Sequence, residues 1–142
     1  LDLGVKIFFE KVALRPGKPT VFGMKGDKLI FALPGNPVST FVTFELFVKP
    51  CIKKMMGFTS YEHPIIHAEL EKVIKIKKKR REYRPALLRQ EGSGWKVSLI
   101  DWHGSGDLFS ITKANGLLII RESVEKLKAG DMVEVMLTDG LL

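Results

Sequence analysis

The first half of the chain alternates short apolar runs with turns rich in glycine and proline. Val5–Leu14 is mostly apolar and contains β-branched and aromatic residues, so it predicts a strand. Thr20–Met24 predicts a second strand, Lys25-Gly-Asp-Lys28 a hairpin turn and Leu29–Leu33 a third strand. Val38–Met56 has apolar residues at helical spacing and predicts a helix.

Four residues mark the ends and a break of this helix. Asn36 is suited to the N-cap, and Pro37 to the first turn, where a missing N–H costs nothing. Pro50 predicts a kink or an early end, because proline removes a helical hydrogen bond. Gly57 is suited to the C-cap.

The period of the pattern changes after a linker at residues 57–64. Ile65–Ile76 nearly alternates and predicts a strand, although Ala68–Lys72 alone also fits a helix. Short apolar segments separated by glycines follow at Leu87–Leu88, Trp95–Ile100, Leu108–Thr112, Leu117–Ile120 and Met132–Leu137. The fold class is therefore part of an α/β unit followed by a small all-β domain, a sandwich or barrel.

Composition limits the cellular compartment in which the protein is expected. No apolar run among the 142 residues approaches the ~20 needed to span a bilayer, so no membrane association is expected. The single cysteine, Cys51, excludes an internal disulfide and is typical of a reducing cytoplasm. Because charged residues interrupt the first apolar stretch, the sequence does not predict a signal peptide. Because the chain starts at Leu1, we expect a fragment or a processed product.

The formal net charge of +7 favours an anionic partner. Nine basic residues oppose four acidic ones in residues 1–57, and 14 oppose 12 in residues 58–142. This excess suits phosphates, oxyanions or nucleic acid, and it does not choose among them.

The loop Leu33-Pro-Gly-Asn-Pro-Val-Ser39 is the first candidate site. It joins a strand to a helix, which is where α/β sheets bind ligands, and its backbone N–H groups at the helix N-terminus suit an anion. Gly35 allows close approach to the backbone, while Pro34 and Pro37 stiffen the loop. A well-capped helix with no ligand explains the same residues equally well.

Basic side chains mark two further segments. Lys11 and Arg15 flank a strand end, and Lys18 lies in the breaker-rich turn that follows. All three suit phosphate contacts, although a solvated turn has the same pattern. The run 75–84 suits nucleic acid, with Tyr83 for stacking, or else a solvated hairpin.

Other candidate motifs are weak. Gly104-Ser105-Gly106 is a turn whose N–H groups and hydroxyl suit a phosphate. His63 and His67 are four residues apart, but no helix is predicted there to bring them to one face, so no metal site is predicted on this chain.

Taken in order, these motifs resemble those of the molybdopterin molybdenumtransferases, the family of MoeA and the gephyrin E domain. The resemblance covers essentially the whole chain. It rests on Arg15-Pro-Gly-Lys-Pro19, Phe22-Gly23, Leu33–Ser39, Arg81-Glu-Tyr-Arg84, Gly104-Ser105, Lys113-Ala-Asn-Gly-Leu117 and Ala129-Gly-Asp-Met-Val-Glu-Val135, with Phe44, Pro50 and Gly57 downstream of the loop.

The resemblance implies a fold and an activity. Residues 1–57 would be the C-terminal part of the molybdopterin-binding α/β domain, and residues 64–142 the C-terminal β-barrel domain. The family inserts molybdate into adenylylated molybdopterin with Mg²⁺ and releases AMP. Its members are cytoplasmic homodimers with a cleft between domains of two subunits.

The resemblance also implies site residues. Lys11, Arg15 and Arg84 would contact molybdate or phosphate, and Ser105 would add a hydroxyl. The family more often has Lys at the position of Arg15. The loop would form a wall of the pterin-phosphate site, through Pro34, Gly35, Asn36, Pro37 and Ser39.

One departure from the family limits the expected activity. The acidic residues that bind Mg²⁺ in the family would lie upstream of Leu1, so we expect this chain to be inactive alone. Two other functions stay open at this point. A nucleic-acid-binding β module would use residues 75–84, and a scaffold would use a surface that clusters receptors, as gephyrin-type relatives do.

Overall fold

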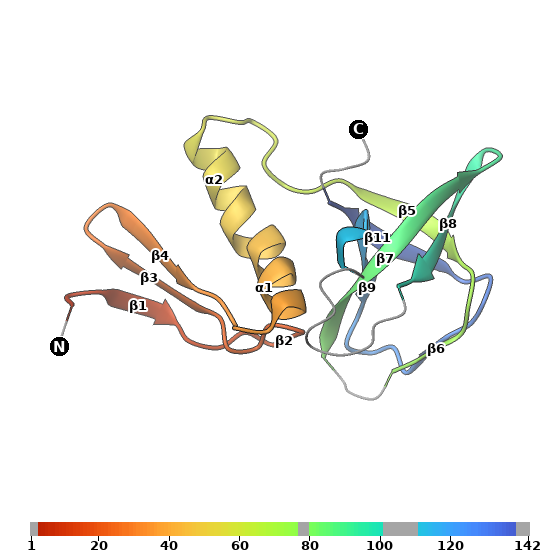
Figure 1. Cartoon of the computed structure of the whole chain (residues 1–142), viewed down its shortest axis with the longest axis horizontal. Coiled ribbons are helices and arrows are strands. Elements are labelled where there is room, and N and C mark those ends of the chain that lie inside the picture. The colour runs from red at the N-terminus through yellow and green to blue at the C-terminus, as the bar shows by residue number, and fades with distance from the viewer. Residues whose placement is uncertain (1–2, 77–79, 101–110, 139–142) are drawn as a thin grey trace.

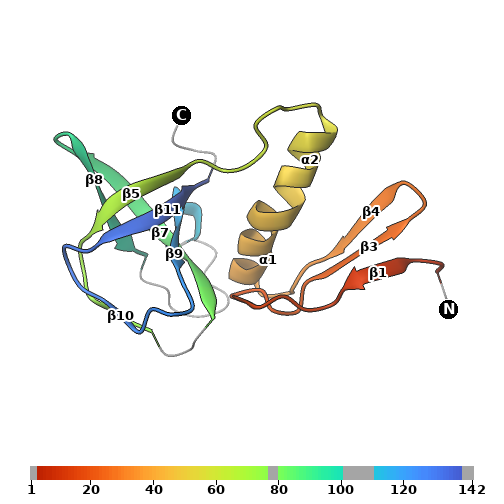
Figure 2. The same ribbon diagram turned by 180° about the vertical axis from the view of Figure 1, so that it is seen from behind.

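The computed structural model describes residues 3–76, 80–100 and 111–138. A three-stranded sheet, a long helix and a β-barrel follow one another along the longest axis (Figure 1). The helix lies between the sheet and the barrel, and the view from behind shows the same arrangement (Figure 2). No helix of the described residues is long and apolar enough to cross a membrane.

The first sheet is an antiparallel meander of β1 (Lys6–Phe9), β3 (Val21–Lys25) and β4 (Lys28–Ala32). The predicted hairpin at residues 25–28 is confirmed, because Lys25 pairs with Lys28 across a two-residue turn. The rule about ligands at the carboxyl edge applies to parallel strands, so it does not apply to these three.

The prediction of one strand over Val5–Leu14 is wrong. β1 ends at Phe9, and the chain turns away before β2 (Leu14–Arg15), which pairs with a barrel strand. Leu14 is buried there, so the apolar pattern belongs to two different packing surfaces.

The helix is continuous from α1 (Pro37–Thr43) through a π-helical turn, η1 (Phe44–Val48), to α2 (Lys49–Met55). The N-cap at Asn36, the first-turn Pro37 and a positive φ at Gly57 confirm the predicted ends. Pro50 does not end the helix.

The π turn accommodates Pro50. The Lys49 N–H bonds to the carbonyl of Phe44, five residues back. The next π-type bond would join residue 50 to the carbonyl of Glu45, but proline has no N–H to donate. His63, from the linker, fills the gap: its Nε2 lies 2.9 Å from that carbonyl and 3.2 Å from the Glu45 carboxylate. Both are acceptors, so Nε2 carries the proton.

The second half is a small barrel, as predicted. Its strands are β5 (Ile65–Leu70), β7 (Arg81–Glu91), β8 (Gly94–Leu99), β9 (Gly116–Ile120) and β11 (Met132–Leu137), in the order β7-β8-β5-β11-β9. The barrel closes where β9 pairs again with β7. β2 adds to β7 in parallel, and β6 (Ile74–Lys75) pairs with β10 (Lys126–Leu127).

The strand predicted over Ile65–Ile76 is confirmed for Ile65–Leu70, where Ala68 and Leu70 point into the barrel from β5, but it breaks before β6. Of the predicted strand Leu108–Thr112, residues 108–110 lie outside the described residues, and Ile111 and Thr112 are helical.

β9 is buried on both of its faces, and β11 buries residues on both faces as well. One face forms the barrel interior, with Leu88, Leu118 and Val135 among its residues. On the other face, Leu117 and Met136 pack against Val42 of α1. Alternating positions of β9 therefore serve two cores, which fixes the helix on the barrel wall.

Candidate functional site

The turn at residues 15–19 is packed tightly against α1. Gly17 has φ +111°, and a Cβ at this position would lie 2.3 Å from the methyl group of Thr43. The Thr20 hydroxyl donates to the carbonyl of Gly17 at 2.6 Å. Only glycine fits this contact, so the turn is held in place directly after Arg15.

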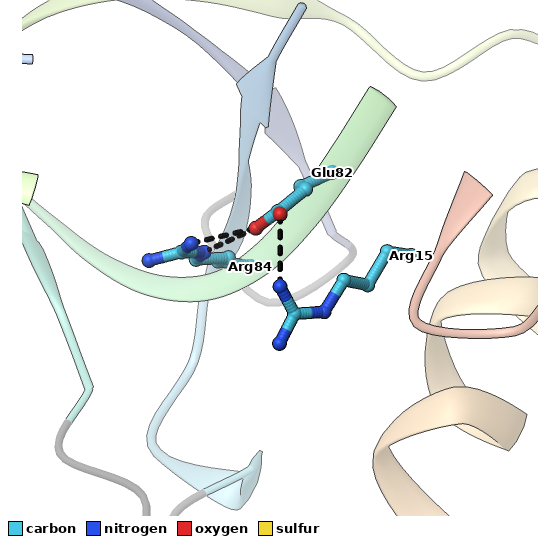
Figure 3. A network of polar contacts seen from close by, with 3 residues as sticks. All are labelled: Arg15, Glu82 and Arg84. Carbon is cyan, nitrogen blue, oxygen red and sulfur yellow. Dashed lines mark hydrogen bonds and ion pairs between the residues drawn. The ribbon is translucent and has the colours of Figure 1, made fainter. Parts of the chain in front are cut away.

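The parallel pairing of β2 with β7 sets Arg15 opposite Glu82. The Arg15 guanidinium donates to Glu82 Oε1 at 3.1 Å. Arg84 donates to Glu82 Oε2 twice, through Nε at 2.8 Å and Nη2 at 2.6 Å. Figure 3 shows the carboxylate between the two guanidinium groups, one from β2 and one from β7.

A pocket of about 460 Å³ opens at this network, between the turn, α1 and the barrel. Its wall has a charged part and an apolar part. The charged part consists of Arg15, Lys75, Glu82 and Arg84, and the remaining lining is Pro16, Val38, Tyr83, Pro85, Leu99, Ile100 and Ile111. Among the described residues of the wall, three basic side chains face one carboxylate, and this positive excess suits an anion with an apolar part.

The predicted loop, Leu33–Ser39, contributes Val38 to the pocket wall. Asn36 accepts from the Ser39 N–H at 3.2 Å and lies 3.4 Å from the Ser39 hydroxyl. The Thr40 hydroxyl donates to the carbonyl of Pro34. These polar groups are used within the loop and helix, and the pocket wall takes Val38 from this segment.

Open space surrounds the position that a Cβ of residue 35 would occupy. No atom lies within 4 Å of where its Cβ would be, and its φ lies outside the left-handed region. The chain does not require glycine here for packing or for backbone conformation.

The other predicted site residues divide into three groups. Arg15 and Arg84 come together, as the prediction requires of anion contacts. Lys11 is exposed and is not part of the described pocket wall. Ser105 lies outside the described residues.

The sequence reasoning missed two charged residues of the described pocket wall, Glu82 and Lys75. Glu82 is two residues from Arg84 on a strand, so both face the same side, and this spacing is readable in the sequence. Lys75 belongs to the basic run that was predicted to bind nucleic acid or to form a solvated hairpin, and no spacing distinguishes it from the basic residues that follow. Its place in the wall comes from the pairing of β6 with β10.

Comparison with known families agrees with this arrangement. Residues 67–138, slightly more than half of the chain, match the family described as MoeA C-terminal region (domain IV). The chain belongs to the MoeA C-terminal region family. Residues 2–54 of this MoeA-family chain match a second family, described as a probable molybdopterin binding domain.

Named relatives and solved structures agree with this membership. The chain is 35% identical over 140 residues to a molybdopterin molybdenumtransferase of Staphylococcus epidermidis, and 32% identical over 135 residues to one of Staphylococcus aureus. A molybdopterin biosynthesis MoeA protein from Pyrococcus horikoshii OT3 superposes with a TM-score of 0.75 and 31% identity. A molybdenum cofactor biosynthesis protein from Pyrococcus furiosus gives a TM-score of 0.75 and 30% identity.

The MoeA-family chain is much shorter than these relatives. The matches cover 98% and 95% of this chain but 33% and 32% of the two Staphylococcus proteins. They cover 97% and 94% of it but 34% and 46% of the two Pyrococcus chains. The resemblance to this family and the α/β-plus-barrel fold are confirmed, and the individual site residues stay predictions.

Proposed function

We propose that this chain acts in molybdenum cofactor biosynthesis as the C-terminal part of a molybdopterin molybdenumtransferase. The whole enzyme would insert molybdate into adenylylated molybdopterin and release AMP. The pocket at Arg15 and Arg84 would bind an oxyanion group of the substrates, molybdate or phosphate. The observation that supports this most is the pair of guanidinium groups, from segments far apart in sequence, on one positive pocket wall.

The chemistry of these side chains fits the role. Guanidinium groups donate in a planar fork that matches the spacing of oxyanion oxygens, and they stay protonated. Lys75 would add a point charge, and Lys11 and Ser105 would complete the contacts from outside the described wall. Pro34, Gly35, Asn36, Pro37 and Ser39 would form the neighbouring wall, with the space at Gly35 open to a ligand.

The remaining features of the enzyme belong to the proposal as well. Residues 1–57 and 64–142 would act as two domains of a longer cytoplasmic homodimer. The described residues hold no group of three His, Cys, Asp or Glu side chains fit to bind a metal ion. The Mg²⁺ of the enzyme would be bound by its other parts, so the isolated chain would not catalyse the transfer.

Equilibrium dialysis against molybdate tests the pocket. We expect saturable binding that phosphate displaces, and Arg84→Gln should weaken it by about tenfold, because a charge-assisted contact is lost. Arg121→Gln is the matched control, since Arg121 is an exposed arginine paired with Glu134 and outside the pocket wall. Equal loss in both variants would show that overall charge, and not the pocket, attracts the anion.

The nucleic-acid alternative is not favoured by the comparisons. It predicts duplex DNA binding whose affinity falls steeply with salt, with a logarithmic slope of about −0.9 per contacted phosphate. Saturable DNA binding with such a slope, and no molybdate binding, would restore it.

A further inference from the structure

Three charged groups meet at the mouth of the pocket, and only one of them is fully buried. The side chain of Glu82 is 2% exposed, whereas those of Arg84 and Arg15 are 27% and 46% exposed. The arginines are long side chains that lose considerable conformational freedom when they are held. The carboxylate is therefore the fixed point of the network.

The barrel fixes the carboxylate through the backbone on both sides of it. Glu82 lies on β7 between Arg15 of β2 and Ile120 of β9. Glu82 is an even number of residues from Ala86 and Leu88, so it lies on the face of β7 that faces the barrel interior. Neither neighbour can shift along the strand without breaking the register, so the Glu82 backbone is fixed, and burial of its side chain restricts where the carboxylate can lie.

Each guanidinium keeps donors beyond those that Glu82 uses. A guanidinium has five N–H groups. Arg84 donates to Glu82 through Nε and Nη2, and Arg15 donates to it through Nη1. Within the described part of the chain no other acceptor takes the remaining donors of these two side chains, so they can bind an acceptor in the pocket.

We propose that Glu82 is a positioning residue, whose carboxylate holds Arg15 and Arg84 at a fixed separation so that both contact one bound oxyanion. This inference rests on the proposed function, because it assumes that the pocket binds an oxyanion. It adds that the geometry of the arginine pair, and not the positive charge alone, sets the affinity.

Charge and geometry predict opposite effects of one substitution. Glu82→Gln keeps the size of the side chain and removes its negative charge, so the pocket becomes more positive. If charge alone set the affinity, molybdate would bind more tightly. If the carboxylate positions the arginines, molybdate binds more weakly, by about tenfold, because a neutral amide holds a guanidinium less firmly than a carboxylate does.

The experiment measures the molybdate dissociation constant of the wild-type chain, Glu82→Gln and Glu82→Asp by equilibrium dialysis. Glu82→Asp keeps the charge but moves it by one methylene, so we expect it to weaken binding as well. Unchanged or tighter binding by either folded variant would overturn the inference. Glu134→Gln is the control for an equal change of charge, because its partner Arg121 lies outside the pocket wall.

A second readout needs no ligand and separates the two proposals. NMR of the Arg84 Nε–H should show slow exchange with water in the wild type, because that N–H is bonded to Glu82 at 2.8 Å. Exchange should accelerate at least tenfold in Glu82→Gln. Fast exchange already in the wild type would refute positioning, whatever the anion does. Absence of wild-type molybdate binding with a slowly exchanging Nε–H would instead refute the proposed function of the pocket.

Discussion

Replacement of His63 tests the explanation of the π turn. His63 is 3% exposed, and its Nε2 donates to the carbonyl of Glu45 that Pro50 leaves without a helical partner. His63→Phe keeps a ring in this place and removes the donor. A buried carbonyl without a partner costs about 1–3 kcal/mol, so the variant should unfold at lower urea concentration.

The single substitution also removes His63 Nδ1, a buried nitrogen that has no partner among the described residues. Loss of this unpartnered nitrogen should raise the free energy of unfolding. The single substitution alone therefore does not give the cost of the unpartnered carbonyl. A double-mutant cycle with Pro50→Ala removes this ambiguity, because Nδ1 is lost in both backgrounds. The Pro50→Ala substitution supplies an N–H that can reach the carbonyl of Glu45 within the helix.

The expected result is coupling between two residues through a single carbonyl. His63→Phe should cost about 1 kcal/mol less in the Pro50→Ala background than in the wild-type background, since the carbonyl then has another donor. Urea unfolding followed by far-ultraviolet circular dichroism measures all four proteins. Additive effects within about 0.5 kcal/mol would refute the explanation, because uncoupled sites add within that margin.

Two further predictions concern backbone fit and pH. Gly17→Ala should destabilise the chain by about 1–3 kcal/mol in urea, because its φ is +111° and its Cβ would meet Thr43 at 2.3 Å. Gly35→Ala is the control, with open space at its Cβ, and should change stability by less than about 0.5 kcal/mol. The Arg121 guanidinium holds the pKa of Glu134 below its usual 4.5, so this pair stabilises the fold above about pH 4.5 and is lost as pH falls through the lowered pKa. Glu134→Gln should therefore reduce the fall in stability as the pH drops below about 4.5, measured by urea titrations at each pH.

The features predicted correctly from the sequence depend on short-range physics. Asn36, Pro37 and Gly57 mark the helix ends because caps act within one turn of the chain. The barrel strands were readable because alternation and glycine turns are local patterns. The splitting of Val5–Leu14 was not readable, because both parts are apolar for different distant partners.

The candidate site shows the same division. Arg84 and Glu82 share a strand face, which two-residue spacing predicts, and the family resemblance named Arg84. The meeting of Arg15 with Glu82 depends on a parallel pairing across 67 residues of sequence. Nothing local in the chain encodes that pairing, and Lys75 reaches the pocket wall through an equally distant strand pair.

The pocket is therefore a property of the junction between the turn and the barrel. Arg15 comes from the segment that Gly17 holds against α1, and Glu82 comes from the barrel wall that packs against the same helix. A change anywhere in this contact would move one guanidinium relative to the other. Buried residues of this junction outside the pocket wall, such as Thr43 and Val42, should thus affect anion affinity as well as stability, whereas exposed residues of the β7–β8 turn should affect neither.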